Sequence, residues 1–174
     1  MRKILKSDFF KSKNTPQIAR DLLGKFLVRR YQGKTTHCMI TEVEAYDGFK
    51  DKASHAHRGR TERNKIMFGK AGHWYVYLTY GMHWMLNIVT GPENYPGAIL
   101  IRGIEGLNGP AKLTKILHID KKLNGKPTDK KSALWLENRG VKISKNKIKS
   151  APRIGVDYAG PIWSRKKYRF YIYK

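Results

Sequence analysis

Two runs of aromatic and branched apolar residues, joined at a single glycine, constrain the fold of this chain more than any other feature. The runs cover residues 74–80 and 82–89, and Gly81 stands between them. Runs of this kind are typical of strands, and glycine tolerates the positive φ that a tight reversal requires. The pattern predicts a β-hairpin with Tyr80 and Gly81 at or near its tip.

Further strands are predicted on both sides of the hairpin. Strand patterns cover residues 25–31, 37–46, 98–102 and 169–173, and residues 141–149 alternate apolar residues with lysine. The last of these patterns is typical of an edge strand that charge protects from further pairing. In 37–46, strict alternation places Ile40, Glu42 and Glu44 on the same face of the sheet.

Three short helices complete the expected fold. The first begins at Thr15-Pro16 with Thr15 as its N-cap, the second begins at Gly109-Pro110, and the third runs from Ser132 to Leu136. No internal repeat or linker divides the chain, so residues 1–174 are expected to form one domain. The expected class is α+β: a single mixed domain in which helices flank a curved, largely antiparallel sheet and the hairpin protrudes.

The charge balance indicates what such a domain binds. The chain has 36 lysine and arginine residues against 13 acidic residues, a formal net charge of +23. Because 40% of the residues are hydrophobic and 11% aromatic, the chain can build a core, which excludes a disordered basic tail. The charge favours a polyanionic partner, nucleic acid before an acidic membrane.

Other features indicate the compartment. Cys38 is the single cysteine, which excludes an internal disulfide and fits a reducing environment. No apolar stretch approaches the ~18 residues needed to cross a bilayer, and charges interrupt the N-terminal segment where a signal peptide would be apolar. We therefore expect a cytoplasmic protein without a membrane partner.

The segment 47–65 is polar and contains several glycine, arginine and histidine residues, so a long loop is predicted there. Loops longer than ~12 residues in a compact domain are usually functional or disordered. Its basic side chains would follow phosphates or form a solvated face: Arg58, Arg60, Arg63 and Lys65. His55 and His57 lack the further ligands of a zinc site, which favours hydrogen bonding to substrate or backbone.

The paired glutamates Glu42 and Glu44 allow three interpretations. They could bind a metal ion in a nuclease, together with Asp47 or Asp51. One of them could instead act as a single general base near a bound base or sugar. They could also be solvated charges on an edge strand. The aromatic residues of the hairpin are likewise either core or a stacking surface for bases, although Tyr80 beside the turn has little core to enter.

At these residues the chain resembles a known family, the alkyladenine (3-methyladenine) DNA glycosylases of the methylpurine-DNA glycosylase type. The matching motifs occur in order from about residue 19 to the end of the chain. They are Thr41-Glu42-Val43-Glu44-Ala45-Tyr46, Arg63-Asn64, Met67-Phe68, Tyr75-Val76-Tyr77, Tyr80-Gly81-Met82, Asn87-Ile88, Leu100 with Arg102, Gly109-Pro110-Ala111-Lys112, Arg153-Ile154-Gly155-Val156 and Trp163-Ser164-Arg165-Lys166.

The resemblance implies a catalytic centre without a metal ion or organic cofactor. Glu44 matches the general base that activates a water molecule, and Arg102 matches the arginine that helps to hold this water. The backbone carbonyl of Ile154 falls where the family supplies another contact to the water. The implied reaction is monofunctional hydrolysis of the N-glycosidic bond of an alkylated, and also a deaminated, purine, leaving an abasic site.

The resemblance also implies a pocket for an extruded base and a surface for duplex DNA. Tyr46, His55 and Tyr77 match the pocket walls, and Asn87 matches an asparagine that disfavours guanine. Tyr80 matches the side chain that is wedged into the duplex. The remaining expected DNA contacts are Met82, Arg58, Arg60 and Arg63. The implied protein is a monomer that acts on damaged double-stranded DNA and is bound to the chromosome.

Three departures from the vertebrate members of this family leave the range of substrates open. The loop 55–64 is one residue shorter and the loop 91–97 is longer, and His83 and Trp84 replace other aromatic residues. Two functions from other classes are also kept as alternatives. A basic, ribosome-associated RNA-binding protein would explain the charge, and a metal-dependent nuclease would use Glu42 and Glu44.

Overall fold

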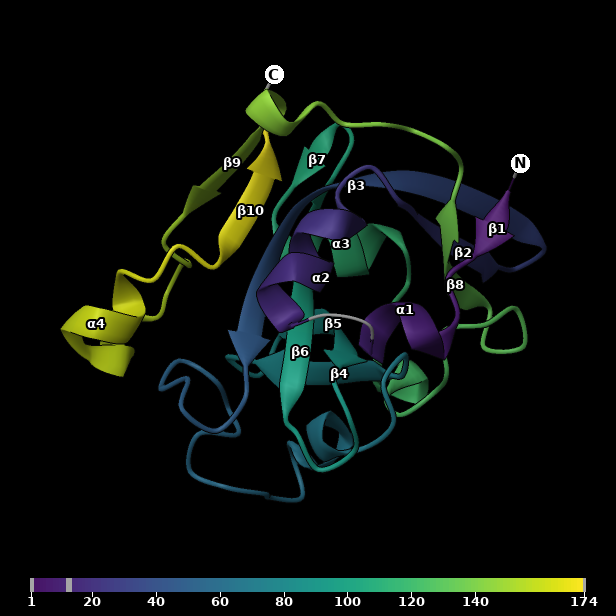
Figure 1. The fold of residues 1–174 in the computed structure, drawn as a ribbon. Helices are drawn as coiled ribbons and strands as arrows, with labels where there is room; N and C mark the ends of the chain where they lie inside the picture. Colours follow the sequence, from purple (N-terminus) through teal and green to yellow (C-terminus); the bar gives the residue numbers. More distant parts are fainter. Residues whose placement is uncertain (1, 12–13, 174) are drawn as a thin grey trace.

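The computed structural model describes residues 2–11 and 14–173 (Figure 1). Within this part of the chain, ten strands form one sheet in which every pairing between strands is antiparallel. The main order is β1-β8-β2-β3-β6-β5-β4, and β7, β9 and β10 pair outside this path. The strands are β1 (Lys3–Ile4), β2 (Phe26–Tyr31), β3 (Lys34–Asp47), β4 (Trp74–Thr79), β5 (His83–Thr90), β6 (Gly97–Ile104), β7 (Leu107–Asn108), β8 (Leu134–Asn138), β9 (Ile148–Ala151) and β10 (Arg169–Ile172).

The long strand β3 bends around the molecule and joins the parts of the sheet (Figure 1). Its first half pairs with β2, and its second half pairs with β6 on one edge and β10 on the other. The register shifts on both sides of Glu42, which marks a β-bulge. Across this irregularity Ile40 and Val43 both enter the core, while Glu44 points to the other face. The expectation that Ile40 shares the face of Glu44 is therefore wrong.

The hairpin of β4 and β5 has the predicted tip. Thr79 pairs with His83, and the N–H of Met82 donates to the carbonyl of Thr79 at 3.1 Å. Tyr80 and Gly81 have φ values of 50° and 68°, so both central residues of the turn are left-handed, as in a type I′ turn. This conformation is uncommon for a bulky aromatic residue.

Four α-helices lie in the described part: α1 (Ser7–Lys11), α2 (Thr15–Leu22), α3 (Pro110–Ile116) and α4 (Gly160–Ser164). Apolar side chains of α2 and α3 share one core with β3, β5 and β6, so both helices cover the same face of the sheet. The predicted helix start at Gly109-Pro110 is confirmed. The N-cap of α2 is Asn14 and not Thr15, because the Asn14 side chain accepts the N–H of Gln17 at 2.9 Å while Thr15 is buried against Thr90.

The sequence prediction is wrong for two segments after α3. Residues 132–136 were expected to be helical, but Leu134–Asn138 is the strand β8, which lies between β1 and β2 with Leu134 and Leu136 in the core. The edge strand expected over 141–149 begins only at Ile148, after a 3-10 turn over Lys145–Lys147. Further 3-10 turns span Lys65–Phe68, Lys121–Leu123 and Asp157–Ala159.

The predicted α+β class with a largely antiparallel sheet is confirmed. None of the helices in the described ranges is both long and apolar enough to cross a membrane. The face of the sheet opposite α2 and α3 carries the polar and aromatic side chains of β3 to β6, and the loop 48–64 and the segment after β9 lie beside it. This second face holds the candidate site.

Candidate active site

A cavity of about 310 Å³ lies where four strands, the loop after β3 and the segment after β9 meet. Each strand contributes alternate residues, because side chains two positions apart share a face. These residues are Glu44 and Tyr46 from β3, Tyr75, Tyr77 and Thr79 from β4, Met85 and Asn87 from β5, and Ala98, Leu100 and Arg102 from β6. His55, Tyr80, Ile154 and Tyr158 complete the polar and aromatic lining.

Eight residues that the sequence analysis selected meet in this one cavity: Glu44, Tyr46, His55, Tyr77, Tyr80, Asn87, Arg102 and Ile154. They come from positions up to 110 residues apart in the chain. Met82, Arg58, Arg60 and Arg63 do not line it. The prediction also missed two lining tyrosines, Tyr75 and Tyr158; the first could have been found, because it alternates with Tyr77 along the same strand.

Glu44 is fully buried and lines this cavity. Its Oε1 accepts the backbone N–H of Ile154 at 2.8 Å, and its Oε2 accepts the hydroxyl of Tyr46 at 2.9 Å. Nη1 of Arg102 lies 3.5 Å from Oε1. Burial raises the pKa of Glu44 above its ordinary value, and the charge of Arg102 and the two hydrogen bonds oppose this shift. The carboxylate is thus a stronger base than an exposed glutamate, and its neighbours favour its ionised form.

Arg102 connects the two glutamates of β3. Its Nε lies 3.3 Å from Oε1 of Glu42, and Nη1 of Arg169 lies 3.0 Å from the same oxygen. Glu42 is therefore paired with two arginines and holds Arg102 against Glu44. Because Glu42 is occupied by these two ion pairs, we assign it the structural role of holding Arg102.

The other carboxylates of the nuclease hypothesis are also engaged. Both oxygens of Asp51 bind Arg153, and Oδ1 of Asp47 accepts the hydroxyl of Tyr95 at 2.9 Å. A divalent cation bound at Glu42 or Asp51 would have to displace an arginine from a carboxylate. The donor arrangement therefore favours the interpretation in which Glu44 acts alone as a base.

The walls of the cavity are aromatic. The rings of His55 and Tyr77 are 4.6 Å apart at 70°, and those of Tyr75 and Tyr77 are 5.2 Å apart. Nδ1 of His55 lies 3.1 Å from the hydroxyl of Tyr75. Burial, together with the charge of Arg63, lowers the pKa of His55, which favours the neutral imidazole with one donor and one acceptor. Burial raises the pKa of Tyr77 to about 12, which keeps its hydroxyl protonated.

Asn87 lines the cavity from β5, beside Tyr75. It pairs with Tyr75 in the hairpin ladder, and its side-chain nitrogen donates to the carbonyl of Tyr75 at 3.1 Å. The side chain is buried, so this hydrogen bond fixes the orientation of the amide. The amide can therefore reject a ligand by shape, because it cannot turn away without losing the bond.

Exposed aromatic residues flank the mouth of the cavity. Tyr80 at the hairpin tip is 87% exposed, and Tyr158 is 69% exposed while its hydroxyl donates to the carbonyl of Ala53 at 2.8 Å. Met82, next to the tip, is also exposed. An exposed aromatic ring beside a cavity of this shape can contact a nucleobase.

The predicted phosphate contacts divide into two kinds. Arg58 and Arg60 are exposed on the loop after β3. Arg63 instead donates through Nη2 to the carbonyl of Leu78 at 2.9 Å, and its guanidinium lies 5.3 Å from the ring centre of Tyr77. Arg63 therefore supports the hairpin and the cavity wall.

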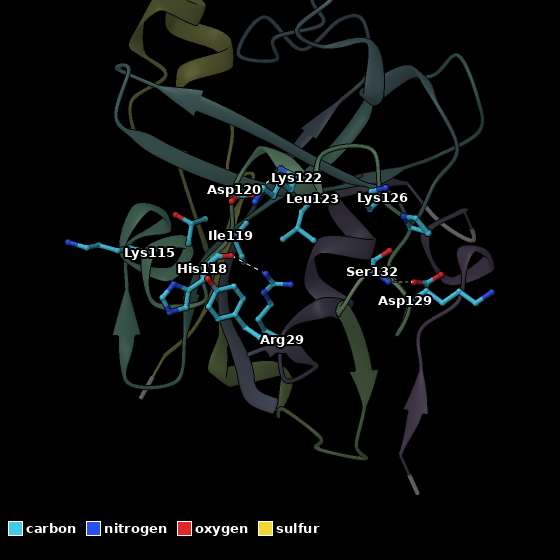
Figure 2. Close-up of a pocket in the computed structure, with 14 residues that line it drawn as sticks. Arg29, Lys115, His118, Ile119, Asp120, Lys122, Leu123, Lys126, Asp129 and Ser132 are labelled. Carbon is cyan, nitrogen blue, oxygen red and sulfur yellow. Dashed lines mark hydrogen bonds between the residues drawn. The ribbon is translucent and has the colours of Figure 1, made fainter. Parts of the chain in front are cut away.

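Figure 2 shows a second cavity, of about 720 Å³, which shares no lining residue with the first. Basic residues outnumber acidic ones in its lining, which includes Lys115, Lys122 and Lys126. The guanidinium of Arg29 in this cavity donates to the backbone carbonyls of residues 117, 118 and 133. Because that arginine is occupied by the protein itself, the smaller aromatic cavity is the better candidate for chemistry.

Comparison with known proteins shows which family this chain belongs to. Residues 8–108 and 106–174 match the family described as Methylpurine-DNA glycosylase (MPG). This chain belongs to the methylpurine-DNA glycosylase family. The resemblance noted in its sequence motifs is therefore confirmed.

Relatives in the family share most of their length with this chain. A protein of Methanocella arvoryzae is 42% identical, with 97% of this chain and 92% of the relative aligned. A protein of Legionella pneumophila (strain Paris) is 40% identical, with 99% of this chain and 95% of the relative aligned. A protein of Borrelia garinii subsp. bavariensis is 39% identical, with 94% of this chain and 94% of the relative aligned. Each of the three carries the provisional name 3-methyladenine DNA glycosylase.

Proposed function

We propose that this member of the methylpurine-DNA glycosylase family is a monofunctional DNA-3-methyladenine glycosylase. It acts on damaged purines in duplex DNA as a monomer associated with the chromosome. The observation that carries the proposal is a single buried carboxylate, Glu44, in a cavity lined by aromatic rings. The names of the relatives agree with this substrate class.

The cavity suits a base that has left the duplex. A purine inside the helix is shielded, so an enzyme that acts on it must extrude it at a cost of a few kcal/mol. Tyr77 and His55 supply faces and edges on which an extruded base can stack. Tyr80, exposed at the hairpin tip, would fill the gap that the extruded nucleotide leaves.

The chemistry follows from the position of Glu44. Its carboxylate takes a proton from water, the water oxygen bonds to C1′ of the sugar, and the bond from C1′ to the base nitrogen breaks with its electron pair going to the base. An alkylated purine carries positive charge and leaves as a neutral molecule, so it needs little acid assistance. Deaminated purines are a second class of substrate that first require protonation. The reaction written in this way requires no metal ion or organic cofactor.

One incubation distinguishes this function from the two alternatives. Alkylated duplex DNA is incubated with the protein, with and without a chelator, and both free bases and strand lengths are measured. Release of free base from intact strands under both conditions supports the glycosylase. Strand cuts that the chelator abolishes would support a metal-dependent nuclease. Binding without reaction would support the nucleic-acid-binding alternative.

A further inference from the structure

A buried ion pair contacts the residue that follows the candidate base in the chain. Nη1 and Nη2 of Arg153 lie 2.5 Å and 2.8 Å from the two oxygens of Asp51, and both side chains are fully buried. Asp51 also accepts the backbone N–H groups of Asp47 and Ala53 at 3.0 Å and 3.1 Å. The carboxylate therefore fixes the start of the loop after β3 and holds the guanidinium by a two-pronged contact.

The guanidinium also contacts β3 beside Glu44. Nη1 of Arg153 donates to the backbone carbonyl of Ala45 at 2.8 Å. The next residue in the chain, Ile154, donates its backbone N–H to Oε1 of Glu44. β9 ends at Ala151, so Ile154 lies beyond the last residue of the strand. The anchor at Arg153 therefore sets where the N–H of Ile154 meets the carboxylate.

The same side chain supports the second donor to Glu44. The guanidinium carbon of Arg153 lies 4.8 Å from the ring centre of Tyr46, whose hydroxyl donates to Oε2 of Glu44. A cation over an aromatic face stabilises both the ring position and the charge. Arg153 is thus linked to both donors of Glu44. It directly precedes Ile154, which donates the backbone N–H, and its guanidinium lies over the ring of Tyr46, which donates the hydroxyl.

We propose that Arg153, held by Asp51, is a positioning residue that brings two hydrogen-bond donors to the two oxygens of the base Glu44. This inference rests on the function proposed above, in which Glu44 is that base. A buried ion pair is weak evidence for stability alone, because the desolvation of two charges offsets their attraction. The contacts of Arg153 with Ala45 and Tyr46 instead indicate that the ion pair orients the two groups that donate hydrogen bonds to Glu44.

The positioning role predicts a change in the pH dependence. In the described part of the chain, the titratable groups that interact with Glu44 are Arg102 from β6, Tyr46 on β3, Tyr77 from β4, and Arg153 and Tyr158 from the segment after β9. The donors from Ile154 and Tyr46 favour the ionised carboxylate. Their displacement would raise the pKa of Glu44 further, so that base release would begin at a higher pH.

The test compares two arginine-to-lysine variants. R153K keeps the charge but loses the planar fork that binds Asp51. R139K makes the same change in a remote pair, where Arg139 lies 2.7 Å from Glu137 on β8. The single-turnover rate of 3-methyladenine release from duplex DNA is measured from pH 5 to 9 for both variants. Affinity for the damaged duplex is measured with E44Q added to each variant, so that no base is released during the titration.

The expected result is a split between rate and affinity. R153K should lose roughly tenfold to a hundredfold in rate at neutral pH, the effect of a small misplacement of a reacting group. Its acid limb should move to higher pH, and its affinity should stay within about twofold. R139K should match the wild type in both measurements. Y46F, which removes one donor directly, should shift the acid limb in the same direction.

Each other result has a defined meaning. If the wild type releases no base, the proposed function fails and this inference fails with it. If the wild type is active and a folded R153K has the same rate and pH profile, only the positioning role is overturned. If circular dichroism shows that R153K is unfolded, D51N is measured in its place, because asparagine keeps the volume of the aspartate side chain. If both variants are unfolded, the pair serves the fold, which also overturns the proposal.

Discussion

The backbone N–H of Ile154 lies 2.8 Å from Oε1 of Glu44, a residue 110 positions earlier in the chain. The family resemblance implied a role for the carbonyl of Ile154 toward a water molecule, and the structure adds a contact from its N–H to the base itself. A carboxylate that accepts a backbone N–H is held in one orientation and favoured in its ionised form. This contact gives the C-terminal segment a direct part in the candidate site.

Replacing Glu44 with glutamine should remove catalysis while preserving binding. The amide has the shape of the carboxyl group but cannot take a proton from water, so single-turnover base release should fall by about 10²- to 10⁴-fold. Affinity for damaged duplex, measured by fluorescence anisotropy, should stay near the wild-type value. E42Q is the matched control and should lose much less activity, because Glu42 acts only by holding Arg102. Near-normal release by E44Q would refute the assignment.

The raised pKa of Glu44 also predicts how the stability depends on pH. Because burial favours the neutral form, the contribution of Glu44 to folding is fully present below its ordinary pKa and is lost as pH rises through the folded value. E44Q lacks this loss. Its free energy of unfolding should match the wild type near pH 4 and exceed it at pH 8, as measured by denaturant titration. A gap that widens toward acid pH would mean that Arg102 outweighs burial.

Much of the sheet could be predicted from the sequence, because the hairpin and β6 have strong strand patterns and clear turn residues. The error at β8 arose because Leu134, Trp135 and Leu136 form a short apolar run, which periodicity cannot assign to helix or strand. Pairing with β1 and β2 decides its conformation. The bulge beside Glu42 was missed for a similar reason, since the sequence of one strand does not show the register of its partners.

The candidate site could be predicted where sequence motifs carry it, and not where it depends on contacts between side chains of distant segments. Motif resemblance located Glu44 and Arg102, which face each other across the paired strands β3 and β6. The sequence suggests Asp51 only as a metal ligand, because nothing in it shows that Arg153 reaches Asp51 across 102 positions. The partner of His55 was also missed, since the contact with Tyr75 depends on how the loop folds over β4.

Removal of the Asn87 side chain should change the selectivity. Its amide is fixed in the cavity wall by the hydrogen bond to Tyr75, where it would crowd the exocyclic amine of a guanine-type base. N87A should raise release of 7-methylguanine relative to 3-methyladenine by roughly tenfold, the size of effect that one group in a pocket can have. The measurement is the ratio of single-turnover rates on the two lesions. An unchanged ratio would show that Asn87 has only a structural part in the wall.

The net charge of +23 predicts steep salt dependence of binding to undamaged duplex DNA. Each phosphate contact contributes ~0.9 to the slope of log affinity against log salt concentration. R58A should lower this slope by about that amount, because Arg58 is exposed on the loop beside the cavity. K131A, at the second cavity, is the control and should leave the slope unchanged. A flat titration of the wild type would mean that the basic surface faces another partner.

Tyr80 should act as a wedge in duplex DNA. Two substitutions can distinguish this role of its ring from the role of its backbone in the turn. Both Y80A and Y80G remove the ring, but only glycine relieves the left-handed backbone at φ 50°, so Y80G should be about 1 kcal/mol more stable than Y80A. If the ring fills the gap left by an extruded nucleotide, both variants should lose tenfold to a hundredfold in base release from matched duplex, since unstacking costs a few kcal/mol. On a lesion in single-stranded DNA, which has no stack to open, both should stay within about twofold of the wild type. Equal proportional losses on the two substrates would instead mean that Tyr80 supports the cavity, and a loss in Y80A that glycine restores would assign its role to the turn.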